Sequence, residues 1–245
     1  MARTLVIGDI HEPVTHPGYF DFIKYIRDEW QTDQTIFIGD VVDMHGISFH
    51  SAHPEAPGPC DEYEQAHDGI HKWYGEFPKA RVCIGNHDER IVRLAESVNI
   101  PSKFLRNYNE IWDTPGWEWG YDFIDDDVYY FHGTGNGGGA SGSPAFKVMQ
   151  EQLMSSVIGH FHTKGGVQWT VGPTARRFGM DTGCGVDARK YAFAYNRHSK
   201  KKPMLSCGVV IDGHPYHEMM PCGPGERFHR GQYQEGGPRP RKSQQ

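Results

Sequence analysis

The sequence lacks the features that mark membrane and secreted proteins. No apolar run approaches the roughly 18 residues that a membrane-spanning helix needs. Hydrophobic residues make up 37% of the 245-residue chain and the mean hydropathy is -0.64, so a soluble protein is expected. The first residues, MARTLVIGDIH, contain neither an apolar signal core nor a small-residue cleavage site, so secretion and membrane attachment are not expected.

Cysteine is scarce, and no two cysteines form a Cys-x-x-Cys pair. An odd set without such pairs argues against a disulfide framework or a zinc ribbon and favours reduced thiols. We therefore expect a cytoplasmic protein, in the host cytoplasm if a phage encodes it. The five cysteines are Cys60, Cys83, Cys184, Cys207 and Cys222.

Charge is distributed unevenly along the chain, whose net charge is -6. Residues 1–163 carry 11 Lys and Arg against 25 Asp and Glu, whereas residues 164–202 carry 9 against 2, a surplus of +7. A basic segment in an acidic protein is typical of a surface that receives a phosphate-bearing partner. A solvated basic hairpin or loop is the alternative for the same composition.

Five short apolar runs end on residues that can bind metals. In an α/β protein, ligands bind outside the carboxyl ends of the strands. Helix-like stretches at 17–30 and 62–77 precede the second and third runs, which favours such a fold. The runs TLVIGD, TIFIGD, RVCIGN, DVYYFHG and SSVIGH lead to Asp9, Asp40, Asn86, His132 and His160.

The donor types indicate a centre for borderline divalent metals. Carboxylate, imidazole and amide groups without thiolates favour Mn, Fe, Zn or Co in a reactive site over a structural zinc. Any one of these residues alone is more typical of a turn or a cap, but together they predict a shared site. Seven candidates are too many for one ion and suit two ions with a shared carboxylate: Asp9, His11, Asp40, Asn86, His132, His160 and His162.

Five motifs resemble, in order and spacing, those of the calcineurin-like metallophosphoesterases, especially small cap-less members from bacteria and phages. They are GDIH (8–11), GDVVD (39–43), GNHD (85–88), FHG (131–133) and GHFH (159–162). The resemblance implies an α/β fold, a two-sheet β-sandwich flanked by helices in four α/β/β/α layers, with the active site at the C-terminal edge of the strands. We expect one such domain over residues 1–220 and an extended or disordered Gly/Pro/Arg-rich tail over 221–245.

The resemblance also implies how the candidate residues divide their work. Asp9, His11, Asp40 and His162 would hold one divalent ion, and Asp40, Asn86, His132 and His160 the other, with Asp40 bridging. Mn is expected first, with Fe, Zn, Ni or Co as alternatives. A metal-bridging hydroxide would attack phosphorus, and His87 would protonate the leaving oxygen as general acid. Asp88 would orient the His87 ring by accepting a hydrogen bond.

The substrate is less constrained than the reaction class. Protein Ser/Thr phosphatases carry GDxHG and GDxxDRG, whereas this chain has Glu12 after His11 and Met44-His45 after Asp43. Arg90 and His45 are candidate substrate-binding residues, although a structural salt bridge is the alternative for Arg90. A phosphodiesterase or nuclease, acting on nucleic acid or nucleotides, is favoured over a nucleotide or protein phosphatase. A non-catalytic metal-bound interaction module is a further alternative, and the oligomeric state is left open.

Several other segments carry weaker predictions. The loop GTGNGGGASGSP (133–144) contains G-x-G-x-x-G, but the next strand ends on Gly159-His160 without the acidic residue that a dinucleotide site requires. The loop at 44–60 is long enough to wall the active site. Asp125 to Asp127 should form a hairpin turn, and Trp112, Trp117, Trp119 and Tyr121 should belong to the core. The runs GGVQWTV, KYAFAYN and MLSCGVVIDG should complete the second sheet.

Overall fold

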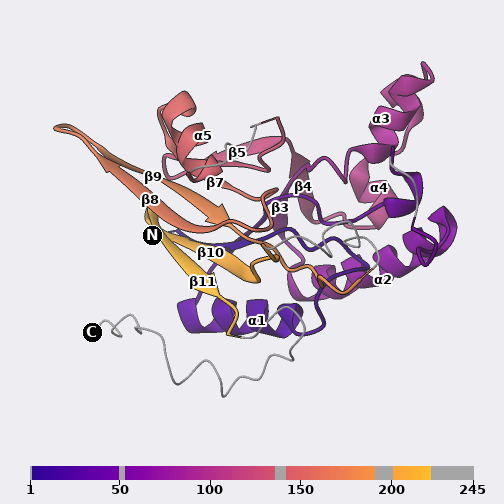
Figure 1. Ribbon diagram of the computed structural model, residues 1–245, viewed down its shortest axis with the longest axis horizontal. Coiled ribbons are helices and arrows are strands. Elements are labelled where there is room, and N and C mark those ends of the chain that lie inside the picture. The colour runs from indigo at the N-terminus through magenta and orange to yellow at the C-terminus, as the bar shows by residue number, and fades with distance from the viewer. Residues whose placement is uncertain (1, 50–52, 136–141, 191–200, 222–245) are drawn as a thin grey trace.

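The computed structural model describes residues 2–49, 53–135, 142–190 and 201–221 and contains two mixed β-sheets flanked by helices (Figure 1). The first sheet has the order β11-β10-β1-β2-β3-β4. Its strands are β1 (Arg3–Ile7), β2 (Gln34–Phe37), β3 (Ala80–Cys83), β4 (Trp117–Gly120), β10 (Ser206–Ile211) and β11 (His214–Met219). The predicted fold class, an α/β two-sheet sandwich flanked by helices, is confirmed.

The second sheet has the order β5-β6-β7-β9-β8. Its strands are β5 (Asp122–Asp125), β6 (Val128–Phe131), β7 (Ser155–Ile158), β8 (Gly165–Val171) and β9 (Arg176–Thr182). The predicted hairpin turn joins β5 to β6, with Asp126 and Asp127 at φ 48° and 57°. Two consecutive positive φ angles form the tight turn whose twist suits an antiparallel hairpin.

Helices connect the parallel strands of the first sheet. They are α1 (Tyr19–Trp30), α2 (Pro59–Glu76), α3 (Arg90–Ser97) and α4 (Tyr108–Trp112), with short 3₁₀ turns η1 (His45–Ile47) and η2 (Ser102–Phe104). The first two confirm the helices predicted at 17–30 and 62–77. α2 begins slightly earlier than predicted because Pro59 fits the first helical turn, where its missing N–H is not needed.

The first sheet is buried on both faces, which explains its continuous apolar runs. Leu5 and Ile7 point into a core shared with α1 and α2, where Trp73 is fully buried. Val6, between them in sequence, points into the core between the two sheets with residues such as Val157. The remaining helix, α5 (Pro144–Gln152), covers the outer face of the second sheet.

One prediction about strand placement is wrong. The run MLSCGVVIDG forms β10, which pairs with β1 in the first sheet rather than completing the second. β8 and β9 complete the second sheet instead. Because β10 is buried almost throughout, its apolar pattern suits either sheet. Most of KYAFAYN, the tail from 222, His50 and part of the Gly-rich loop lie outside the described residues.

Two further predictions can be compared with the described residues. No helix among them is long and apolar enough to cross a membrane. Trp112 and Trp117 belong to the core as predicted, each 2% exposed, whereas Tyr121 is 57% exposed. The prediction for Tyr121 is therefore wrong, because it lies just beyond the end of edge strand β4, where nothing covers its ring completely.

Candidate metal centre and active site

The ends of five parallel strands bring the predicted ligands together. β1, β2 and β3 run parallel in the first sheet, and β6 and β7 run parallel in the second. Contacts cross between the sheets: Nε2 of His132, after β6, lies 3.1 Å from Oδ2 of Asp40, after β2. Nε2 of His162, after β7, lies 3.1 Å from Oδ2 of Asp9, after β1. One cluster therefore draws on both sheets.

Asp40 lies at the junction of two groups of metal-type donors. One group comprises Asp9, His11, Asp40 and His162, and the other comprises Asp40, His132 and His160. Asn86 Oδ1 lies 3.2 Å from His132 Nε2, beside the second group. The structure therefore brings together the residues of the two predicted sets, with Asn86 beside the second group. Burial would raise the pKa of Asp40, but the charges of His132 and His87 hold it well below its usual range.

The protons on His132 indicate that a cation belongs in this centre. Nδ1 of His132 donates to the carbonyl oxygen of Ile38 at 3.0 Å, so a neutral ring has its lone pair on Nε2. That Nε2 faces two acceptors, the Asp40 carboxylate and the Asn86 amide oxygen. Burial alone would lower the pKa of His132, but Asp40 and Asp9 raise it to about 10. Either a proton or a metal ion must sit between these three acceptors.

The first group shows the same arrangement. Nδ1 of His11 donates to Oδ1 of Asp43 at 2.9 Å, which leaves the Nε2 lone pair 3.1 Å from Nε2 of His162. Burial, reinforced by His87, lowers the pKa of His11 to about 4, so this ring is neutral near pH 7. Oδ1 of Asp9 is buried and has no hydrogen-bond partner. An unpaired acceptor on a buried group is costly, and a bound divalent cation would satisfy this oxygen.

The backbone around the centre is held in conformations that side chains usually avoid. His11, Asp40 and His160 have φ of 49°, 46° and 66°, the left-handed region that costs a non-glycine residue about 1 kcal/mol or more. Glycines make room beside them, because a Cβ on Gly85 would meet the Asp40 carboxylate and one on Gly159 would meet Asp9. Such strain at three predicted ligands is typical of a functional site.

His87 faces this centre, but its orienting partner is not the predicted one. Its Nδ1 donates to the carbonyl oxygen of Asp43 at 2.8 Å and lies 3.2 Å from Asp43 Oδ1. Burial alone would lower the pKa of His87, but Asp40 and Asp43 raise it. The carboxylate of Asp88 instead accepts hydrogen bonds from the amides of Val41, Val42 and Gly85. The predicted contact is therefore corrected, because Asp88 braces the two ligand loops while Asp43 holds His87.

Comparison with known proteins decides the family. Residues 2–188 match the model of the calcineurin-like phosphoesterases. The chain belongs to this family. Solved structures with a similar fold include vacuolar protein sorting 29 from Cryptosporidium parvum, which is 10% identical with a TM-score of 0.45, and covers 89% of this chain and 96% of its own.

Another similar structure is YfcE, a phosphoesterase from E. coli, which is 13% identical with a TM-score of 0.41 and covers 85% of this chain and 88% of its own. A comparison with curated proteins gives no match.

Two residues of this centre were not predicted as parts of the site. Asp43 belongs to the GDVVD motif, and it forms a third donor group with His11 and His87. Its position three residues after Asp40, in the same motif, was the sequence signal that could have placed Asp43 in the site. Glu62 of α2 is 1% exposed and accepts hydrogen bonds from the amides of His45 and Gly46, both at 2.6 Å. It fixes the turn after Asp43 from a distant helix, for which the sequence has no local signal.

The two predicted substrate-binding residues occupy different positions. Arg90 begins α3, donates to the Asp43 carbonyl oxygen at 2.5 Å and lies 3.2 Å from His87 Nε2, so it reaches into the site. Nε2 of His45 accepts a hydrogen bond from the amide of His53 at 3.0 Å, and its Nδ1 lies 4.0 Å from Asp43. Arg90 therefore has the better access to a phosphate, while His45 stabilises its own loop.

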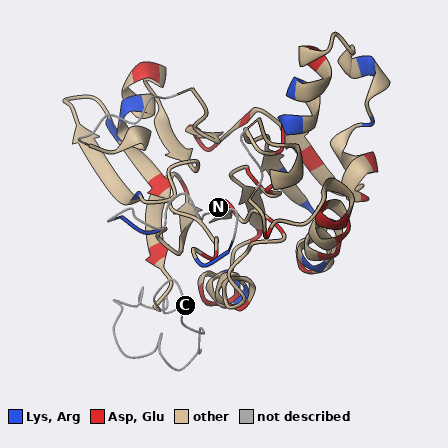
Figure 2. Cartoon of the chain, turned by 45° about the vertical axis from the view of Figure 1, so that its right-hand side comes forward, with Lys and Arg blue, Asp and Glu red and all other residues tan. Residues whose placement is uncertain are grey.

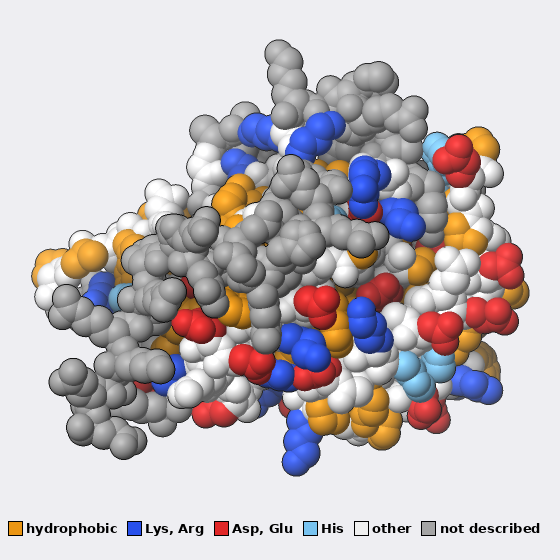
Figure 3. Space-filling model, turned by 90° about the horizontal axis from the view of Figure 1, so that it is seen from below, with side chains coloured by type: hydrophobic (Ala, Val, Ile, Leu, Met, Phe, Trp, Pro, Cys, Tyr) orange, Lys and Arg blue, Asp and Glu red, His pale blue; other side chains and the backbone are white. Residues whose placement is uncertain are grey.

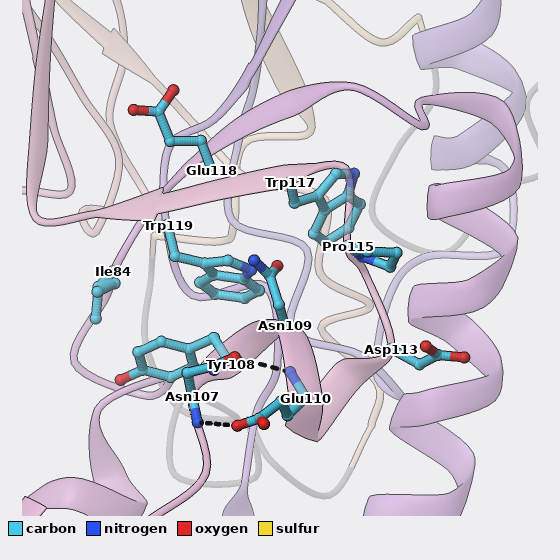
Figure 4. Close-up of a pocket in the computed structure, with 10 residues that line it drawn as sticks. All are labelled: Ile84, Asn107, Tyr108, Asn109, Glu110, Asp113, Pro115, Trp117, Glu118 and Trp119. Carbon is cyan, nitrogen blue, oxygen red and sulfur yellow. Dashed lines mark hydrogen bonds between the residues drawn. The ribbon is translucent and has the colours of Figure 1, made fainter. Parts of the chain in front are cut away.

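A separate pocket of about 800 Å³ lies between α4 and the edge strand β4 (Figure 4). Tyr108 stacks on Trp119 within it, with ring centroids 4.7 Å apart and planes inclined by 16°. None of the predicted metal ligands lines this pocket. Its lining includes Ile84, two residues before Asn86, but none of the grouped metal-type donors, so the pocket is distinct from that cluster.

Proposed function

We propose that this chain is a metal-dependent phosphoesterase that holds two divalent ions, manganese first among them, and hydrolyses phosphodiesters in preference to monoesters. The observation that carries the proposal is the set of buried metal-type donor atoms that gather around Asp40. It includes Asp9 Oδ1, which has no hydrogen-bond partner, the ring nitrogens of His11 and His162, and His132 Nε2, which lies 3.1 Å from Asp40 Oδ2. Divalent ions bound there would polarise a phosphoryl oxygen and acidify a water molecule.

His87 is suited to donate the proton that the leaving oxygen requires. Its Nδ1 is committed to the Asp43 carbonyl, so proton transfer falls to Nε2, which the Arg90 guanidinium contacts at 3.2 Å. The neighbouring carboxylates of Asp40 and Asp43 favour the protonated ring, which raises its pKa against the effect of burial. Arg90, beside Nε2, is placed to bind a phosphate oxygen and keep the ester next to the acid.

Formal charge favours a phosphate ester as the ligand of this centre. Two divalent ions, Arg90 and a protonated His87 would contribute six positive charges, against three negative charges from Asp9, Asp40 and Asp43. This surplus would attract an attacking hydroxide and the charged ester. The preference for a diester is supported by the basic residues that follow Arg90, Arg93 and then Lys103, because they suit an extended polyanion better than a single phosphate group.

The test is turnover after reconstitution with Mn²⁺, Zn²⁺, Fe²⁺, Ni²⁺ or Co²⁺, comparing bis(4-nitrophenyl) phosphate with 4-nitrophenyl phosphate. We expect a higher kcat/KM for the diester. His87→Ala should retain metal and lose about 10²- to 10⁴-fold in kcat, with the larger loss on esters whose leaving groups are poor. Stoichiometric metal binding without turnover of any ester would instead establish a non-catalytic module.

A further inference from the structure

The segment that leaves the catalytic motif carries positive charge in an otherwise acidic chain. Residues 90–106 contain four basic residues, Arg90, Arg93, Lys103 and Arg106, and one acidic residue, Glu96. They form α3 and η2, and basic segments mark this part of the chain at the upper right of Figure 2. A surplus of +3 next to the metal centre would attract a polyanion.

Two large aromatic rings lie exposed on this segment and beside it. Phe49 is 53% exposed and Phe104 is 72% exposed, so the core uses neither ring fully. A cation lies over each ring: the Arg93 guanidinium is 5.2 Å from the centre of the Phe49 ring, and the Lys103 ammonium is 5.4 Å from that of Phe104. The opposite face of such an exposed ring can stack on a base, and the cation can bind its phosphate.

The pairs continue outward from the catalytic residues. Arg90 contacts His87 and the carbonyl of Asp43, inside the site. Arg93 follows three residues later, so it lies on the same face of α3 one turn further out. η2, which contains Lys103 and Phe104, contacts α3 in turn. We call this series of five residues the α3 strip: Arg90, Arg93, Phe49, Lys103 and Phe104.

Within the basic segment predicted from composition, the arginines of the β8–β9 hairpin lie far from the centre. Arg176 and Arg177 lie at the start of β9, whereas the chain just after the other end of β9 contacts Asp9 through the bridge to Cys184. At the rise of a β-strand, the two ends of β9 are about 20 Å apart. Arg189 forms an ion pair with Asp187. On the face seen in Figure 3, acidic and basic side chains of the described residues are interspersed over the lower part, and Lys and Arg side chains gather near the upper edge. Among the described residues, the α3 strip is thus better placed than the arginines of this hairpin, because Arg90 contacts His87.

We propose that the α3 strip binds single-stranded nucleic acid and delivers its phosphodiester to the metal centre, a proposal that rests on the phosphoesterase function above. Stacking on Phe49 and Phe104 requires bases whose faces are free, which a single strand offers and a duplex does not. The strip is therefore expected to discriminate against duplexes and against single nucleotides, which engage only one of its ends.

The experiment measures binding separately from catalysis. The full chain is dialysed against a chelator, and fluorescence anisotropy is recorded with 12-nucleotide oligo-dT, oligo-rU and a 12-base-pair duplex over a series of salt concentrations. Phe49→Ala should weaken single-strand binding about 5- to 150-fold, the equivalent of one lost stacking contact. Arg93→Gln should reduce the slope of log K against log salt by about 0.7, one phosphate contact.

The β8–β9 hairpin offers a matched control. Arg176 lies 5.7 Å from the Trp169 ring, which is 37% exposed, so the same kind of pair exists far from the site. Arg176→Gln and Trp169→Leu should leave binding and its salt dependence unchanged. Equal losses in the hairpin and strip variants, or duplex binding as tight as single-strand binding, would overturn the proposal.

Turnover distinguishes failure of the strip from failure of the phosphoesterase function. With metal restored, kcat/KM for the oligonucleotide relative to bis(4-nitrophenyl) phosphate should fall in Phe49→Ala and Arg93→Gln. If the small diester is hydrolysed but this ratio does not change, the strip proposal is wrong and the phosphoesterase function stands. If no ester is hydrolysed although Phe49→Ala weakens binding, the strip stands and the proposed catalytic function is wrong.

Discussion

Replacement of Asp43 by asparagine should damage both metal retention and turnover. The substitution keeps the size of this buried side chain and removes its charge. In the wild type, Asp43 Oδ1 accepts a hydrogen bond from His11 Nδ1 at 2.9 Å and lies 3.2 Å from His87 Nδ1. The bonds to both rings hold the pKa of Asp43 well below its usual range despite burial, so the carboxylate is ionised.

The expected magnitude follows from the loss of charge-assisted hydrogen bonds. Such a bond contributes about 1.5–3 kcal/mol, or about 10- to 150-fold, and changes behind a metal-binding histidine typically cost 10- to 100-fold in affinity or activity. Asp43→Asn should therefore weaken metal binding by one to two orders of magnitude in a chelator competition titration. With metal at saturation, kcat on bis(4-nitrophenyl) phosphate should remain depressed because His87 is still misoriented.

Asp88→Asn is the control for this reasoning. The Asp88 carboxylate accepts three backbone amides, and an asparagine NH₂ group cannot accept the one from Gly85 at 2.8 Å. An unpaired buried amide costs about 1–3 kcal/mol, so Tm should fall by about 2–4 °C per kcal/mol. At saturating metal its kcat should change only a few-fold. Loss of turnover in Asp88→Asn at unchanged Tm, with Asp43→Asn active, would refute the assignment of Asp43 as the residue that holds His87.

Three other predictions concern the centre and the stability of the fold. Asp40→Ala should release both metal ions, measured by elemental analysis, and full retention of either would contradict its place in both donor groups. Gly85→Ala should weaken metal binding at least tenfold, because the added Cβ meets the Asp40 carboxylate. Burial lowers the pKa of His217 to about 4. Between pH 6.5 and 4 the native state therefore binds fewer protons than the unfolded state. The stability present above pH 6.5 is lost as the pH falls toward 4. By pH 5 the loss should be about 2 kcal/mol, and thermal melts of His217→Gln should show a shallower acid limb; an unchanged limb would argue against a buried neutral ring.

The sequence by itself was sufficient to locate the donor residues. Each lies just after a short apolar run, and parallel strands expose their carboxyl ends at one edge, so Asp9, Asp40 and Asn86 had to come close together once a parallel sheet formed. His132 and His160 follow the same rule in the second sheet. These inferences hold because strand direction and the residue after a strand are local properties of the chain.

The tertiary structure decided which neighbours those residues have. Asp43 and Asp88 both lie within three residues of a predicted ligand, so the sequence does not distinguish them as partners of His87. The backbone turns at Asp40 and Met44, with φ of 46° and 51°, and this path brings Asp43 against His87. Glu62 fixes that turn from α2, a contact between residues 16 or 17 positions apart. β10 could join either sheet, since a strand buried on both faces carries no alternation to distinguish them. Side-chain direction at a turn and the choice of partner for a buried strand depend on long-range packing, which residue order does not encode locally.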